Sequence, residues 1–132
     1  MAVVGLSFTI LIFRIKREID MAEKGETTWI AFSDWLVAIA LIVAGLFVLV
    51  PLLASDAAGR GRLPLSALVF AVVMVLGWVP AILAHYRLIF RGKRTGPRDN
   101  PEPAEGAIVL VVVLLSAVAF TVTYYLPRLL HG

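Results

Sequence analysis

His85 is the first residue whose chemistry stands out, because it is one of two histidines in the chain and lies near the end of a long apolar stretch. A neutral imidazole in such a place is a good axial ligand for a haem or a chlorophyll. The other histidine, His131, is the penultimate residue, so no second ligand lies within an apolar stretch. Tyr86 and Arg87 follow directly, as is typical of a membrane interface. The sequence therefore leaves two interpretations of His85: a cofactor-binding ligand, with the cofactor unknown, or an interfacial side chain.

Asp34 is the other titratable residue placed for chemistry, since it directly precedes a charge-free stretch that begins at Trp35. A carboxylate at such a depth serves ion coupling in transporters. In the first turn of a helix it also acts as a cap and complements the helix dipole, which is the role we expect. The chain has no cysteine, no phosphate-binding loop, no HExxH or GxSxG motif and no carboxylates at a catalytic spacing. We therefore predict that it is not an enzyme.

A short segment rich in basic residues follows the second apolar stretch. Such a segment sets membrane topology and attracts anionic lipid headgroups, by about 1 kcal/mol for each basic side chain. Binding of a polyanion, or of an acidic patch on a partner, is the alternative. Aromatic residues are not interleaved with the charges, which argues against nucleic acid as a partner. The predicted contact residues for a lipid headgroup or a polyanion are Arg87, Arg91, Lys93, Arg94 and Arg98.

The elements that position these residues follow from hydropathy. The 132 residues are 61% hydrophobic and 16% charged, and the mean hydropathy is +0.94, which excludes a water-soluble globular domain. Residues 35–55, 63–86 and 106–127 contain no charge, and each stretch reaches the roughly 20 residues that a helix needs to span a bilayer. We predict an all-α integral membrane protein, a single membrane domain over 1–132 with transmembrane helices within 29–55, 63–90 and 106–127.

The N-terminal part divides into two segments. Residues 1–13 are apolar but short, so they form a fourth span, an interfacial segment or a helix packed against a partner. Residues 14–28 are predicted to form an amphipathic cytoplasmic helix that ends near Gly25 and lies on the membrane surface or docks to a partner. Its apolar face comprises Ile12, Ile15, Ile19 and Ala22.

The distribution of basic residues predicts the orientation. Residues 14–28 carry four and residues 87–105 carry five, whereas the rest of the chain has Arg60, Arg62 and Arg128. Short loops rich in Lys and Arg stay in the cytoplasm. We therefore place 14–28 and the basic loop 91–105 in the cytoplasm and the C-terminus outside, in the inner membrane of a bacterium.

Small residues recur at the four-residue spacing that lets helix backbones approach closely in lipid. The positions predicted to pack helices are Ala40 and Ala44, Ala67 and Ala71, and Gly77 and Ala81, with a similar pair at Ala117 and Thr121. Gly77 and Pro80 predict a kink in the second span, and Pro51 a bend or an end of the first. Trp78, beside that kink, needs a partner for its indole N–H, which we expect on another subunit.

The segment His85-Tyr86-Arg87, with Arg91 and Lys93-Arg94-Thr95-Gly96-Pro97-Arg98-Asp99-Asn100, resembles the loop after the second helix of the vacuolar transporter chaperone membrane domain. Phe32 and Trp35-Leu36 are similar to the Phe-x-x-Trp-Leu element of that family, which also has three spans. The resemblance implies an oligomeric membrane domain that passes or anchors polyphosphate through a ring of basic residues. Trp29-Ile30-Ala31 replaces the Asn-Glu-Arg-Thr that precedes this phenylalanine in the family.

Two functions remain at this point. The first is a non-catalytic integral membrane subunit that packs against other subunits, as a hetero- or homo-oligomer, in a larger membrane complex. The alternative is a small homo-oligomeric channel or transporter for an anion or a polyanion such as polyphosphate. The chain is small, and three helices bury little of their apolar surface against one another. Both features favour the membrane subunit over the channel.

Overall fold

The computed structural model describes residues 2–25, 30–55, 61–86, 88–89 and 102–131, and of 127–131 the backbone alone. This part of the chain is helical and contains no strand. The elements are α1 (Ala2–Glu23), α2 (Asp34–Ala44), the π-helical segment η1 (Gly45–Leu49), α3 (Val50–Ala54), α5 (Arg62–His85) and α6 (Pro103–His131).

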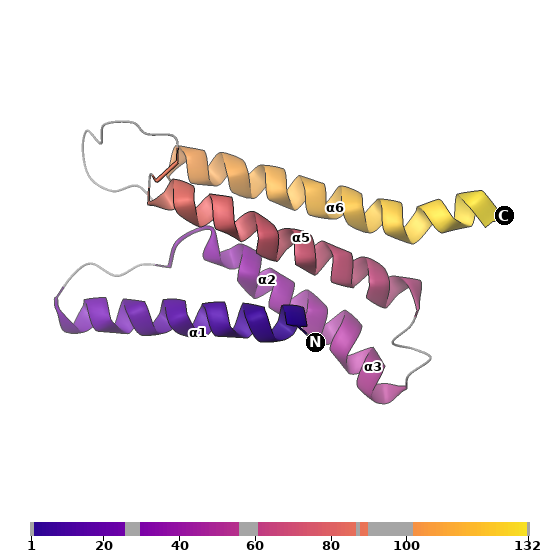
Figure 1. The fold of residues 1–132 in the computed structure, drawn as a ribbon, viewed down its shortest axis with the longest axis horizontal. Coiled ribbons are helices and arrows are strands. Elements are labelled where there is room, and N and C mark those ends of the chain that lie inside the picture. The colour runs from indigo at the N-terminus through magenta and orange to yellow at the C-terminus, as the bar shows by residue number, and fades with distance from the viewer. Residues whose placement is uncertain (1, 26–29, 56–60, 87, 90–101, 132) are drawn as a thin grey trace.

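The helices lie in a row in the order α6, α5, α2 and α1 (Figure 1), in which each helix packs against the next. α1 also touches α5. Three helical stretches are long and apolar enough to cross a membrane, namely Asp34–Ala54, Arg62–His85 and Pro103–Leu126. The prediction of an all-helical chain with three such helices is therefore confirmed.

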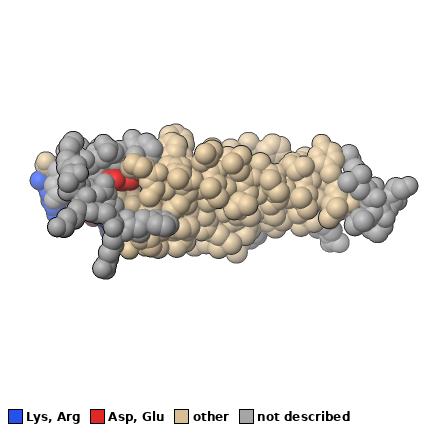
Figure 2. All heavy atoms as spheres, turned by 90° about the horizontal axis from the view of Figure 1, so that it is seen from above, with Lys and Arg blue, Asp and Glu red and all other residues tan. Residues whose placement is uncertain are grey.

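Charged residues gather at one end of the row. Apart from Arg62, the described charged side chains belong to α1, to Lys24 directly after it, to the first residue of α2 and to residues 102–105. In the view of Figure 2 the visible Lys, Arg, Asp and Glu atoms lie at one end of the molecule. We call this the polar end, and its buried members are Arg14, Ser33, Asp34, His85, Glu102 and Glu105.

α1 differs from the two separate segments expected over 1–13 and 14–28, because it is one continuous helix of 22 residues. The helix ends near Gly25, as the sequence predicts. Gly25 adopts a φ of 70°, and its N–H donates to the carbonyl of Ala22 at 3.0 Å. A positive φ after the last turn is the usual way in which glycine ends a helix.

The side of α1 that faces the bundle also differs from the amphipathic expectation. Ser7 and Arg14 are the buried residues of this helix. Ile15 and Ile19, from the apolar face, are 58% and 53% exposed. The helix therefore turns a charged side chain inward and leaves its apolar stripe uncovered by the rest of the described chain.

The first apolar stretch changes its winding just before Pro51. The N–H of Val50 donates to the carbonyl of Gly45, five residues earlier, which widens the turn. A proline ring clashes with the carbonyl four residues before it in a regular α-helix, and the wider turn relieves this clash. The bend expected at Pro51 takes this form, and the helix then continues to Ala54. α5 runs through Pro80 as one helix.

Small residues occupy the contacts between helices. The main core contains Ala40 and Ala44 of α2, Ala71 and Ala81 of α5, and Val109 and Val112 of α6. Ala67 is also buried. A Cβ atom added at Gly77 would lie 2.4 Å from both methyl carbons of Val112, so α5 and α6 approach each other closely there. Of the positions predicted for helix packing, Ala40, Ala44, Ala71 and Ala81 thus belong to the core, and Gly77 lies at the contact of α5 with α6.

Candidate functional site

A buried ion pair at the polar end joins α1 to α2. Nε of Arg14 lies 2.9 Å from Oδ2 of Asp34, and the two residues are only 6% and 4% exposed. The indole Nε1 of Trp78 donates to Oδ1 of Asp34, also at 2.9 Å. Both carboxylate oxygens of Asp34 are therefore engaged, and three helices meet on one side chain.

This geometry corrects two predictions. Trp78 finds its hydrogen-bond partner within the chain, rather than on another subunit. Asp34 binds side chains of α1 and α5, and the N-terminus of α2 has no side-chain cap. As the first residue of α2, Asp34 still complements the positive end of the helix dipole.

Tyr86 holds two arginines of α1 next to this pair. Its hydroxyl accepts hydrogen bonds from Arg14, at 2.7 Å, and from Arg17. The guanidinium carbon of Arg17 lies 4.7 Å from the centre of the Tyr86 ring, which is a favourable cation–π distance. Burial lowers the pKa of Arg14, but the hydrogen bonds with Tyr86 and Asp34 and the charge of Asp34 outweigh it and raise the pKa above its usual value. The Arg14 guanidinium therefore stays charged.

A second buried pair joins α5 to α6. Nδ1 of His85 lies 2.8 Å from Oε2 of Glu105, and the side chains are 2% and 0% exposed. The backbone N–H of Ser33 donates to Oε1 of Glu105 at 2.7 Å, and that of Glu102 donates to Oε2 at 3.3 Å. Glu105 thus ties the first turn of α6 to the end of α5 and to the residue before α2.

His85 is therefore a buried partner of the Glu105 carboxylate. Its ring also meets the ring of Tyr86 edge-on, with centroids 5.0 Å apart. The side chain is 2% exposed, so little of the ring is accessible in this conformation, and the interpretation of His85 as a cofactor ligand stays a prediction. In the part of the chain that the structure describes, no three histidine, cysteine or acidic residues are grouped to hold a metal ion.

The sequence predicts that Glu105 lies in the basic loop 91–105 and indicates no functional role for it. The structure places it inside α6, which begins at Pro103. Its sequence context matches that of Asp34, because each acidic residue directly precedes a charge-free stretch. An acidic residue directly before a charge-free stretch is therefore the sequence feature that Asp34 and Glu105 have in common.

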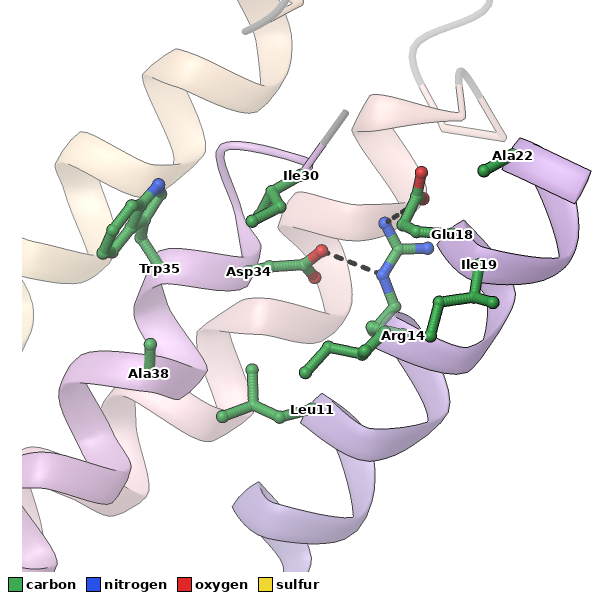
Figure 3. A pocket seen from close by; sticks show the side chains of 10 residues that line it. Leu11, Arg14, Glu18, Ile19, Ala22, Ile30, Asp34, Trp35 and Ala38 are labelled. Carbon is green, nitrogen blue, oxygen red and sulfur yellow. Dashed lines mark hydrogen bonds and ion pairs between the residues drawn. The ribbon is translucent and has the colours of Figure 1, made fainter. Parts of the chain in front are cut away.

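The surface of the described part of the bundle includes two grooves that bear on function. The first has a volume of about 420 Å³ and lies between α1 and the start of α2 (Figure 3), where Arg14 reaches toward Asp34 and Glu18 contacts Arg14. The second has a volume of about 330 Å³ and is lined by Val43, Phe47, Leu63, Ala67, Phe70, Ala117, Phe120 and Thr121. His85 lines neither groove.

The basic residues predicted to contact a lipid headgroup or a polyanion lie outside the described residues. They are Arg87, Arg91, Lys93, Arg94 and Arg98.

Comparison with known protein families, with curated proteins and with solved structures finds no match to this chain. The resemblance to the vacuolar transporter chaperone membrane domain therefore stays a prediction.

Proposed function

We propose that this chain is a non-catalytic integral membrane subunit that packs against other subunits of a larger complex. Its three long apolar helices support a membrane location. The surplus of basic residues in 14–28 and 87–105 supports an orientation with the polar end in the cytoplasm and the C-terminus outside, in a bacterial inner membrane. The two buried pairs, Arg14 with Asp34 and His85 with Glu105, support a structural role for the polar end, because each carboxylate is held by partners from neighbouring elements.

The second groove is the surface on which we expect a helix of another subunit to pack. Ala117 and Thr121 stand four residues apart on α6 and are both exposed, and Ala67 is buried at the adjoining surface of α5. Small residues at this spacing allow close approach of another helix in lipid. Ala40 and Ala44 of α2, and Ala71 and Ala81 of α5, are buried in the core of this chain, whereas Ala117 and Thr121 are exposed in the described part of the structure. α6 itself lies at the edge of the row and packs mainly against α5 (Figure 1).

Cross-linking from the groove tests this function. The chain has no cysteine, so Thr121→Cys supplies a single attachment point for a photoreactive maleimide in native membranes. We expect one protein adduct of discrete mass, which is either a second copy or a different subunit. Ala107→Cys, at an exposed position of α6 outside both grooves, is the control and should give none. A chain that gives no protein adduct from position 121 and elutes as a monomer in mild detergent contradicts the proposal.

A further inference from the structure

The groove between α1 and α2 calls for an occupant different from that of the second groove. Its walls carry bulky side chains from both helices, and its two alanines, Ala22 and Ala38, lie on different helices. It therefore lacks the pair of small residues that a closely packed helix needs. A helix with its side chains is about 10–12 Å across, whereas a hydrocarbon chain is much narrower. The volume of about 420 Å³ is at the lower end of the usual range for small-molecule sites.

The polar residues of this groove come from both helices and meet at one level. Arg14 and Glu18 belong to α1 and Asp34 to α2, and Nη2 of Arg14 lies 3.8 Å from Oε1 of Glu18. The groove thus carries both signs of charge at the polar end, where Arg14 reaches from α1 to Asp34 (Figure 3). A zwitterionic phospholipid headgroup also carries both signs, and it lies at this level of a bilayer.

The remaining lining suits an acyl chain. Leu11 and Ala38 lie one turn from the ion pair on the apolar side, and Ile15 and Ile19 continue the apolar lining on the other side. Trp35 lines the groove and is 57% exposed, as expected for an aromatic residue at the edge of a membrane. This lining also accounts for the exposed apolar stripe of α1, which no other described helix covers.

We propose that the groove between α1 and α2 binds one zwitterionic phospholipid, with an acyl chain against Leu11, Ile15 and Trp35 and the headgroup beside Arg14 and Glu18. The inference rests on the membrane location proposed above. The proposed lipid occupies a defined site and is distinct from the bulk lipid that surrounds the helices. α1, α2 and the lipid then form one unit at the polar end.

Quenching of Trp35 fluorescence by phosphatidylcholine with brominated acyl chains tests this site. The full chain with Trp29→Phe and Trp78→Phe retains Trp35 as its single tryptophan. The matched control adds Trp35→Phe and Val79→Trp, which places the tryptophan on α5 at an exposed position outside both grooves. Both proteins are placed in phosphatidylglycerol vesicles with an increasing fraction of the brominated phosphatidylcholine, and circular dichroism verifies that they remain helical.

We expect half-maximal quenching of Trp35 at a fraction of brominated lipid several-fold lower than that needed for the control. Ala38→Phe, which fills the groove, should remove the difference. Equal quenching curves for Trp35 and the control, or a difference that Ala38→Phe leaves unchanged, would overturn the lipid site while leaving the membrane location intact. Absence of quenching in both proteins would instead refute the membrane location, and with it the proposed function.

Discussion

At the scale of single residues, Asp34 carries the junction of three helices, because Arg14 and Trp78 both depend on its carboxylate. Asp34→Asn keeps the shape and an acceptor for Trp78 but leaves the buried guanidinium of Arg14 without its anion. A buried charge that loses its partner costs about 3–5 kcal/mol. We expect Asp34→Asn to lower the free energy of unfolding by this order, measured by chemical unfolding in detergent.

Two further variants separate the charge from the shape. Asp20→Asn, at an exposed position of α1, removes a carboxylate of the same type and should change stability by less than about 0.5 kcal/mol. Arg14→Met combined with Asp34→Asn removes the unpaired charge and should regain most of the lost stability. If the double variant is as unstable as Asp34→Asn alone, the ion pair is not the cause.

Glu105 allows a comparison between charge and hydrogen bonding at the second pair. Glu105→Ala leaves the N–H of Ser33 and the ring of His85 buried without their acceptor, at a cost of about 1–3 kcal/mol for each orphaned group. Glu105→Gln keeps an oxygen for Ser33 and should cost less. Thermal unfolding in detergent ranks the variants, and Glu23→Ala on the exposed side of α1 is the neutral control. Equal losses for Ala and Gln would show that the hydrogen bond from Ser33 contributes nothing.

These pairings mark the limit of what the sequence predicts at this scale. Asp34 and His85 attract attention because each stands at the boundary of an apolar stretch. Their partners are 20 residues away along the chain in both cases, at Arg14 and Glu105, and no local spacing connects them. The cost of burying an unpaired charge requires a partner but does not identify it. The structure was needed to show that α1 supplies one partner and α6 the other.

At the scale of helices, Gly77 sets the distance between α5 and α6. Gly77→Leu would force its side chain into Val112, and overpacking of this kind costs about 1–3 kcal/mol. We expect a lower thermal midpoint in detergent and a partial recovery when Val112→Ala is added. Gly45→Ala is the matched control, because no atom lies within 4 Å of a Cβ placed there. A loss of stability in Gly45→Ala equal to that in Gly77→Leu would contradict the packing explanation.

Helix type and number are predictable because lipid requires every backbone group to be paired within the segment. Hydropathy therefore finds the three long apolar helices in spite of their many β-branched residues. The N-terminal region is less predictable, since the change from apolar to charged residues after Phe13 suggests two elements. α1 is continuous because Arg14, the first charge after that change, is paired inside the bundle and does not have to reach water.

At the scale of the whole molecule, the predicted orientation is open to a direct measurement. Arg60→Cys and Arg94→Cys introduce single thiols on the two sides, because the native chain has no cysteine. A membrane-impermeant maleimide added to intact cells should label position 60 and leave position 94 protected until the membrane is opened. Labelling of both positions from the same side would contradict the three-span topology.

The alternative function also belongs to this scale. An anion channel lined by the basic loop should lose its flux in reconstituted vesicles when Arg91, Lys93, Arg94 and Arg98 are neutralised, while insertion stays normal. A non-catalytic subunit predicts no flux with the native chain. Flux that disappears in the neutralised variant would therefore favour the channel over the subunit.

The convergence of three helix ends on Glu105 has a consequence for biosynthesis. The chain leaves the ribosome from its N-terminus, so Ser33 and His85 are synthesised before the carboxylate that satisfies them. Arg14 and Asp34 can pair early, whereas the second junction waits for the last helix to be made. A nascent chain that stops short of residue 105 leaves the backbone N–H of Ser33 and the ring of His85 without the carboxylate that they contact in the full-length chain. These two unsatisfied groups distinguish the incomplete chain from the full-length one.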